Sequence, residues 1–134
     1  MYLLDTNIIS FIAKNHMATI NKLESVDGDQ VSTCSIVMSE LFFGAVNHPD
    51  PVRGKIHLQN YSKLSSQTLI YDFDIEAAMT FAQLKSQLKK TGIVIDDFDL
   101  LIGSIALAND LILVTNNTKH FAKIPNLRLE DWSK

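Results

Sequence analysis

Short apolar runs alternate with longer amphipathic segments along almost the whole chain. The apolar runs show no strict alternation of apolar and polar residues, which is typical of strands that are covered on both faces. We therefore predict five short strands, over residues 2–4, 31–34, 68–71, 111–114 and 127–129. Because strands alternate with helices, the pattern predicts a parallel, doubly wound α/β sheet.

The amphipathic segments between the strands have the apolar spacing of helices. They predict six helices, over residues 8–15, 17–25, 35–46, 52–64, 75–90 and 97–108. Ser35 is expected to cap the third helix, and Asp72 or Asp74 the fifth. Gly92 is well placed to end the fifth helix, because glycine readily adopts the left-handed conformation that follows a helix.

The same spacing predicts which face each helix buries. The predicted buried residues include Gly44 in the third helix, Ile75 and Met79 in the fifth, and Phe98 in the sixth. The aromatic side chains in general, including Phe43 and Phe98, are expected in the core or at subunit contacts rather than stacked on nucleic-acid bases.

Composition favours an ordinary globular protein, with 46% hydrophobic and 20% charged residues. A chain of 134 residues fits one domain, residues 1–134, with a proper core. No apolar run is long enough to cross a membrane, and the first residues lack a signal-peptide pattern, so we expect a cytoplasmic protein. The single cysteine, Cys34, excludes a disulfide framework and a thiolate zinc site.

The net charge of −3 argues against a protein that coats nucleic acid non-specifically, since such binding depends on Lys and Arg. It does not exclude a nuclease, because a cluster of acids lowers the net charge and a divalent cation would offset it locally. A nuclease with an acidic metal site is therefore compatible with the charge.

Four polar residues lie near strand ends or helix starts, which meet at the carboxyl edge of a parallel sheet. Asp5 ends the first strand, Asp99 lies in the first turn of a helix, and Asn117 follows the strand at 111–114. Glu40, about one and a half turns into its helix, could reach the same carboxyl edge of the sheet. Such oxygen ligands suit Mg²⁺ or Mn²⁺, and crowding without metal should raise the pKa of at least one acid.

Each of these residues also has a plainer interpretation. Asp96 could cap the helix while Asp99 only occupies its first turn. Glu40 could be a half-exposed helix residue, and Asn117 could belong to a turn with a helix cap. The histidines share no metal-ligand spacing, and we expect surface or loop roles for all four, His16, His48, His57 and His120.

Several motifs, in their order and spacing, resemble the PIN-domain ribonucleases, specifically the VapC toxins of bacterial toxin–antitoxin pairs. The resemblance covers essentially the whole chain, although each motif alone is weak. The motifs are LDTN at residues 4–7, SIVMSELFFGA at 35–45, DLLIGSIA at 99–106, LVTNNTKHF at 113–121 and PNLRLEDW at 125–132.

The resemblance implies a PIN-like three-layer α/β sandwich with a central parallel sheet of four to five strands. It also implies that Asp5, Glu40 and Asp99 are the catalytic, metal-binding carboxylates. Thr6 matches the hydroxyl residue that supports the first acid in the family.

Two positions depart from the family pattern. Asn117 stands where a fourth acid often follows the Val-Thr strand, so a second metal would be held more weakly or not at all. Asp96 stands where relatives commonly have Gly, and it could partly replace the missing charge or simply cap the helix. The number of metals therefore stays open.

The activity that the resemblance implies is metal-dependent hydrolysis of structured RNA, with transfer RNA as a candidate, which inhibits translation. Products would carry a 5′-phosphate and a 3′-hydroxyl. The family also implies a homodimer that is neutralised by a small antitoxin of the VapB kind, with DNA contacted only through that antitoxin. Residues 41–43 and 52–64 are candidate sources of antitoxin or dimer surface.

Two rival functions follow from the same residues. A phosphatase with Asp5 as nucleophile would want a second Asp where Asn7 stands, and no partner Lys is evident. A non-catalytic PIN-fold module that acts with a DNA-binding antitoxin is favoured only by the missing fourth acid. The intact set of Asp5, Glu40 and Asp99 argues against it.

Overall fold

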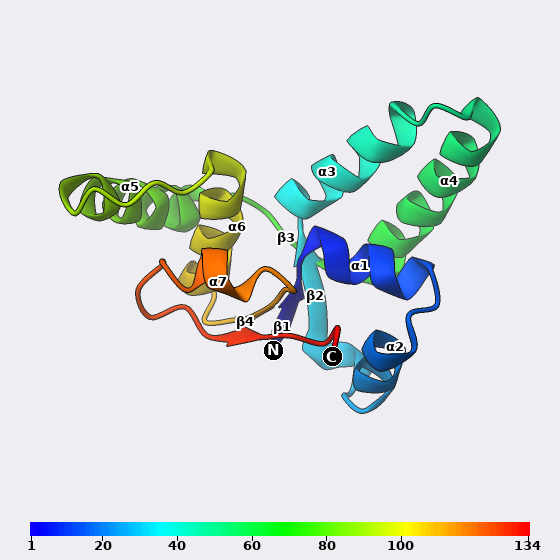
Figure 1. Cartoon of the computed structure of the whole chain (residues 1–134), viewed down its shortest axis with the longest axis horizontal. Helices are drawn as coiled ribbons and strands as arrows, with labels where there is room; N and C mark the ends of the chain where they lie inside the picture. Colours follow the sequence, from blue (N-terminus) through cyan, green and yellow to red (C-terminus); the bar gives the residue numbers. More distant parts are fainter.

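A parallel sheet of five strands forms the middle of the molecule in the computed structural model, which describes residues 1–134 (Figure 1). All strand pairs are parallel, and the strand order is β3-β2-β1-β4-β5. The predicted α/β class and the three-layer sandwich are confirmed. The strands are β1 (Tyr2–Leu4), β2 (Val31–Cys34), β3 (Leu69–Tyr71), β4 (Ile112–Val114) and β5 (Leu129–Glu130).

Seven helices flank the sheet. In the view of Figure 1, α1 to α4 lie on one side of it and α5 to α7 on the other. No helix is both long and apolar enough to cross a membrane. The helices are α1 (Thr6–Ala13), α2 (Met17–Glu24), α3 (Ser35–Val46), α4 (Pro51–Gln67), α5 (Ile75–Lys90), α6 (Asp97–Ala108) and α7 (Thr118–Phe121), with a short 3₁₀ turn over Gly28–Gln30 before β2.

Strand β1 occupies the centre of the sheet and has neighbours on both edges. It pairs with β2 on one side and with β4 on the other, where Leu4 lies opposite Val114. Two buried hydroxyls of β2 strengthen this arrangement: Ser32 donates to the carbonyl of Tyr2 and Thr33 to that of Leu4, at 2.7 and 2.8 Å. The residue after β1 is thereby held at the middle of the sheet's carboxyl edge.

The helix termini agree with the predictions at some positions and not at others. Asp74 caps α5, accepting from the backbone N–H of Ala77 at 2.9 Å, so the second of the two candidates is the correct one. Gly92 follows α5 with φ +73°, as predicted. Ser35 is not a cap, because α3 begins there and Cys34 occupies the capping position.

The predicted buried faces were wrong at several residues. Ile75 and Met79 of α5 are 85% and 61% exposed, because this helix instead buries a stripe of Ala77, Leu84 and Leu88. Gly44 of α3 is exposed too. Helix α5 packs chiefly against α6, and this contact, which helical spacing alone does not determine, decides the face that is buried.

The two aromatic residues expected in the core or at subunit contacts, Phe43 and Phe98, are both exposed in this chain, by 67% and 51%. Phe98 was also a predicted member of the buried stripe of its helix, and that prediction was wrong. The fully buried aromatic side chains are Phe121 and Trp132. Trp132 packs on Tyr2 with ring centroids 5.2 Å apart, which ties the end of the chain to the central strand.

Candidate active site

Asp5 follows β1 directly and is almost completely buried, with 6% of its surface exposed. Its backbone N–H donates to the carbonyl of Val114 at 2.9 Å, which continues the β1–β4 pairing by one residue. Its side chain caps α1: Oδ1 accepts from the N–H of Thr6 at 2.8 Å. Oδ2 accepts from the hydroxyl of Thr115 at 2.8 Å. Each carboxylate oxygen of Asp5 is therefore held by one hydrogen bond.

Glu40 approaches Asp5 from the first half of α3. Its Oε1 accepts a hydrogen bond from the hydroxyl of Thr6 at 3.2 Å. Thr6 therefore contacts both acids, but with different groups: the backbone N–H binds Asp5 and the hydroxyl binds Glu40. Its hydroxyl does not support the first acid in this structure. The hydroxyl that does so belongs to Thr115, which the sequence analysis did not single out.

Asp99 comes from the opposite side, in the first turn of α6. Its Oδ2 lies 2.9 Å from Nε2 of His120 on α7, and both side chains are about one-quarter exposed. The expectation of a surface or loop role for His120 was therefore wrong. Only a pairing across the fold could have revealed it, since the sequence spacing of the two residues carries no signal.

Asp96 caps α6, because its Oδ1 accepts from the N–H of Phe98 at 2.8 Å. The capping interpretation is thus confirmed. Asn117 precedes α7 and is exposed, and its side chain does not cap that helix. Its predicted supporting role stays a prediction.

The three candidate carboxylates affect one another electrostatically. Burial raises the pKa of Asp5 above its ordinary value, and hydrogen bonds from Thr115 and Thr6 oppose this shift. Burial also raises the pKa of Glu40, with smaller contributions from the negative charges of Asp5 and Asp99. A raised pKa was predicted for at least one acid, but its main cause is burial, and the crowding of negative charges adds a smaller contribution at Glu40.

The pKa of Asp99 is raised as well. Burial is again the main cause, His120 opposes it, and the charges of Asp5 and Asp96 add to it. The three acids thus share one electrostatic environment although they come from three different elements. A cation at this place would relieve both the repulsion and the loss of hydration.

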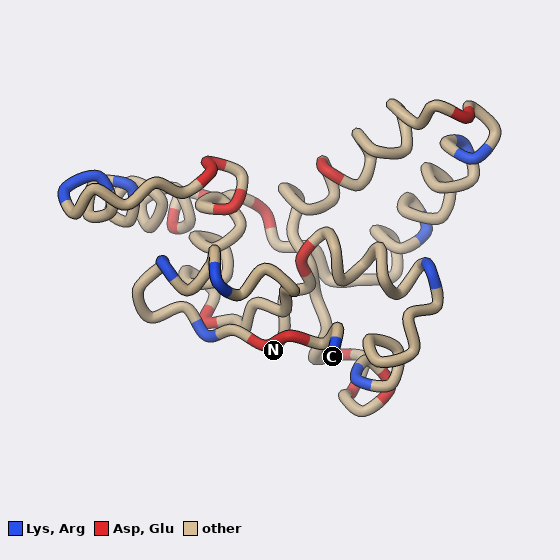
Figure 2. The backbone as a smooth tube through the Cα atoms, viewed as in Figure 1, with Lys and Arg blue, Asp and Glu red and all other residues tan.

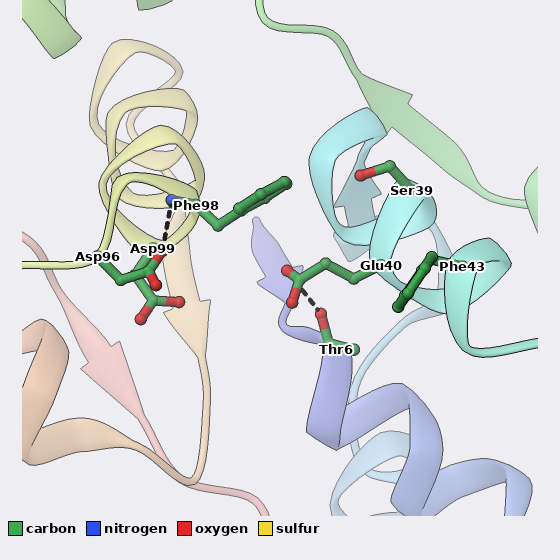
Figure 3. Close-up of a pocket in the computed structure, with 7 residues that line it drawn as sticks. All are labelled: Thr6, Ser39, Glu40, Phe43, Asp96, Phe98 and Asp99. Carbon is green, nitrogen blue, oxygen red and sulfur yellow. Dashed lines mark hydrogen bonds between the residues drawn. The ribbon is translucent and has the colours of Figure 1, made fainter. Parts of the chain in front are cut away.

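A cavity of about 490 Å³ opens between α3 and α6, and three acids line it: Glu40, Asp96 and Asp99. Figure 3 shows Glu40 and Asp99 on its opposite walls, with Thr6 beneath Glu40. Seven residues line it: Thr6, Ser39, Glu40, Phe43, Asp96, Phe98 and Asp99. Two walls supplied by different helices leave room for a ligand of nucleotide size between them.

The donor set fits a hard divalent cation, because it consists of carboxylate oxygens with hydroxyls beside them. The side chains are not already arranged as a complete ligand set: no three His, Cys, Asp or Glu residues surround a common point closely enough to hold an ion. Binding would require Glu40 and Asp99, both only half-buried, to turn toward Asp5.

The family model of the PIN domain matches residues 2–127, which is nearly the whole chain. The chain belongs to the PIN-domain family. Among similar proteins, ribonuclease VapC2 of Rickettsia felis is 37% identical over 100% of this chain and 99% of its own length. The tRNA(fMet)-specific endonuclease VapC of Shigella flexneri is 32% identical over 98% of each chain.

Solved structures of PIN-domain proteins agree with the fold. The VapBC2 complex of Rickettsia felis, bound to a promoter DNA fragment, contains a chain with TM-score 0.84 and 33% identity, over 98% of both chains. The DNA-bound VapBC complex of Salmonella typhimurium contains one with TM-score 0.88 and 29% identity, over 98% of this chain and 97% of that one. The similarity therefore extends over the full PIN domain, including the elements that carry the acids.

Proposed function

We propose that this PIN-domain protein is an endoribonuclease toxin that hydrolyses a phosphodiester bond with Mg²⁺ or Mn²⁺ at Asp5, Glu40 and Asp99. The observation that carries the proposal is the convergence of three carboxylates with raised pKa values from β1, α3 and α6. Names of similar proteins, ribonuclease and endonuclease, supply the reaction class.

Each residue has a distinct part in the proposed reaction. Asp5, fixed by two hydrogen bonds, would be the rigid ligand, and Glu40 and Asp99 would hold the cation from the two cavity walls. When bound, the ion polarises a phosphoryl oxygen and lowers the pKa of water. The water oxygen would bond to phosphorus as the bond from phosphorus to the 3′-oxygen breaks. The proton that this water loses would be balanced by the one that the departing 3′-oxygen takes up. The products are a 5′-phosphate and a 3′-hydroxyl.

The substrate that we propose is a structured RNA, with transfer RNA as the first candidate. Its support is the name of the Shigella flexneri relative, a tRNA(fMet)-specific endonuclease that is 32% identical over nearly the full length. Cleavage of such an RNA would inhibit translation, and the cytoplasm is the compartment that we propose for the reaction. We also propose that residues 1–134 act as one PIN domain, since Trp132 still packs on the central strand.

The partner that we propose is a small antitoxin of the VapB kind, which would bind DNA while this chain does not. Similar chains occur in VapBC complexes, two of them DNA-bound, and this supports such an assembly. The net charge of −3 gives the chain itself little affinity for a DNA backbone. An antitoxin Arg entering the acid cavity would supply the positive charge that a metal otherwise provides. We expect the toxin to be a homodimer within this complex.

Cleavage of total cellular RNA and of transfer RNA tests the activity. Purified protein should cut RNA when Mg²⁺ or Mn²⁺ is present, and a chelator should abolish the cleavage. Sequencing of the products should show 5′-phosphate ends. Asp5→Asn and Asp99→Asn should each lower the rate by about 100-fold or more, because each removes a charged ligand.

Asp97→Asn is the matched control. Asp97 lies beside Asp99 in α6, but it is exposed and pairs with Lys85 on α5 at 3.1 Å. This variant should cleave like the wild type, and thermal unfolding should verify that all variants fold. Cleavage that survives chelator, or full activity of folded Asp5→Asn, would refute the metal mechanism. Absence of cleavage of any cellular RNA would favour a non-catalytic role.

A further inference from the structure

Two exposed phenylalanine side chains line the cavity that holds the acids. Phe43 of α3 is 67% exposed and Phe98 of α6 is 51% exposed. Both line the same cavity of about 490 Å³ as Glu40 and Asp99. In Figure 3, Phe98 extends from its helix toward α3, while the ring of Phe43 lies beyond Glu40 on the other wall. One aromatic ring therefore projects into the cavity from α6, and the other lies beside Glu40 on α3.

Neither ring contributes to the packed core. The neighbouring Phe42 packs against the core, but Phe43 does not, and Phe98 lies outside the core as well. A single exposed apolar residue is common and needs no explanation. Two large aromatic side chains on facing walls of one small acidic cavity are a different case. Folding does not account for them, so a ligand is the better explanation.

The polar lining of the cavity indicates which part of a nucleic acid meets these rings. The lining residues include three acids and no Lys or Arg. Figure 2 shows acidic positions in α3, at the end of β1 and at the start of α6, whereas the Lys and Arg positions lie in other segments, including α4, α5 and α7. Phosphates other than the one at the cation would find no positive partner here. The base faces, in contrast, carry no charge and stack well on aromatic rings.

We propose that Phe43 and Phe98 bind two unpaired nucleobases by stacking, one on each side of the phosphodiester bond held at Asp5, Glu40 and Asp99. The proposal rests on the proposed function. Stacking needs a base whose face is free, so the cut bond lies in an unpaired segment with its bases turned apart. Because every base has a π-face, the two rings select unpaired nucleotides rather than a particular sequence.

A protein surface is the competing occupant of these rings. Such a surface would have to cover the three lining acids together with the rings, because all of them belong to one cavity. Other exposed apolar side chains of the same molecule, Ile75 and Met79 on α5, do not line this cavity and offer a protein partner an apolar surface outside it. The position of Phe43 and Phe98 on the acid cavity thus favours a nucleotide.

Fluorescence of 2-aminopurine tests the proposal directly, because stacking on an aromatic ring quenches it. The probe is a short single-stranded oligoribonucleotide with 2-aminopurine at successive positions, titrated with the full-length protein. Ca²⁺ replaces Mg²⁺, and gel electrophoresis verifies that the probe stays intact. The wild type should quench the probe, whereas the same probe annealed to its complement should show no such quenching.

Conservative variants separate stacking from simple apolar contact. Phe43→Leu and Phe98→Leu keep an apolar side chain but remove the ring, and each should lose quenching and bind about 5- to 150-fold more weakly, which corresponds to roughly 1–3 kcal/mol. Phe43→Tyr should retain quenching. Val46→Ala is the matched control, since Val46 lies on the same helix, is 73% exposed and does not line the cavity.

The outcomes distinguish this proposal from the proposed function. Unchanged quenching and affinity in both Leu variants would overturn the stacking proposal, even if Asp99→Asn still abolishes cleavage. A change of oligomeric state in the Leu variants with normal quenching would overturn it too, in favour of a protein contact. Ring-dependent quenching by a protein that cuts no RNA would support stacking and refute the proposed function instead.

Discussion

Nε2 of His120 lies 2.9 Å from Oδ2 of Asp99, across the space between α7 and α6. One carboxylate oxygen of Asp99 is therefore oriented by an imidazole, which leaves Oδ1 for a cation. His120 also opposes the effects of burial and of the neighbouring acids on the pKa of Asp99. The pair positions a proposed ligand in the same way that hydrogen-bonded outer groups orient metal ligands elsewhere.

Replacing His120 should weaken metal binding. We expect His120→Ala to lower the affinity for Mn²⁺ by about 10-fold or more, because Asp99 loses its orienting partner. His120→Gln should restore much of the affinity, since the amide nitrogen of Gln can occupy the place of Nε2. Isothermal titration calorimetry measures this without any cleavage. Equal Mn²⁺ affinity in wild type and His120→Ala would contradict a positioning role.

Asp96 offers a test that separates capping from metal binding. Asp96→Ala should destabilise the protein by about 1 kcal/mol, because the N–H of Phe98 loses its acceptor. Asp96→Asn keeps an equally good cap and removes only the charge. Urea unfolding should therefore show a loss of stability in the Ala variant alone. If Asn also lowers the Mn²⁺ affinity about 10-fold, Asp96 contributes charge to the metal site in addition to its cap.

Replacing each of two glycines in the α3–α4 hairpin by Ala should change the stability of the protein in opposite directions. A Cβ at Gly54 would lie 2.5 Å from the carbonyl oxygen of Ala45, so Gly54→Ala must push the two helices apart. We expect a loss of about 1–3 kcal/mol in the free energy of unfolding. Gly44 has open space around its Cβ position and lies in a helix, so Gly44→Ala should gain about 0.5–1 kcal/mol. If the two variants changed the free energy of unfolding equally, the close contact between Gly54 and Ala45 would not determine the effect of the added methyl group.

The stability of the metal-free protein should depend on pH in a definite direction. Burial raises the pKa values of Asp5, Glu40 and Asp99 in the folded chain. Over the interval from their ordinary pKa values up to the raised ones, the folded state binds more protons than the unfolded state. Stability is then highest below that interval and falls as pH rises through it. In chelator, these three groups should make Tm lower at neutral pH than at mildly acidic pH.

Variants separate the contribution of the buried acids to the pH dependence of Tm from that of other groups. Asp5→Asn should be more stable than the wild type at neutral pH in chelator and should show a shallower decrease of Tm with pH. Asp97→Asn, at an exposed position, should follow the wild-type curve. Saturating Mn²⁺ should remove or reverse the decrease, because metal binding favours the ionised carboxylates. A Tm in chelator that rises equally with pH in wild type and Asp5→Asn would contradict the shared desolvation of the acids.

The strands illustrate what local sequence can predict well. Residues 31–34 form a strand as predicted, and the segment after Leu4 turns into a helix at Thr6. Apolar runs of this length with polar ends have few alternatives, so their positions follow from burial and turn chemistry. The buried face of α5 was harder: Ile75 and Met79 were predicted to be buried, but the helix buries Ala77 and Leu84, because its contact with α6 joins segments whose relative rotation local spacing does not specify.

In the candidate site, too, some features follow from the sequence and others only from the tertiary structure. By itself, the sequence determined the α/β class, the strand-end position of Asp5 and the helix-start position of Asp99, because these depend on local patterns and on the rule that parallel strands end at one edge. Only the tertiary structure decided that Thr115 holds Asp5, that His120 holds Asp99, and that Phe43 and Phe98 stand exposed beside the acids. Those relationships join residues that are distant along the chain, and no local periodicity encodes a distance between two helices on opposite sides of a cavity.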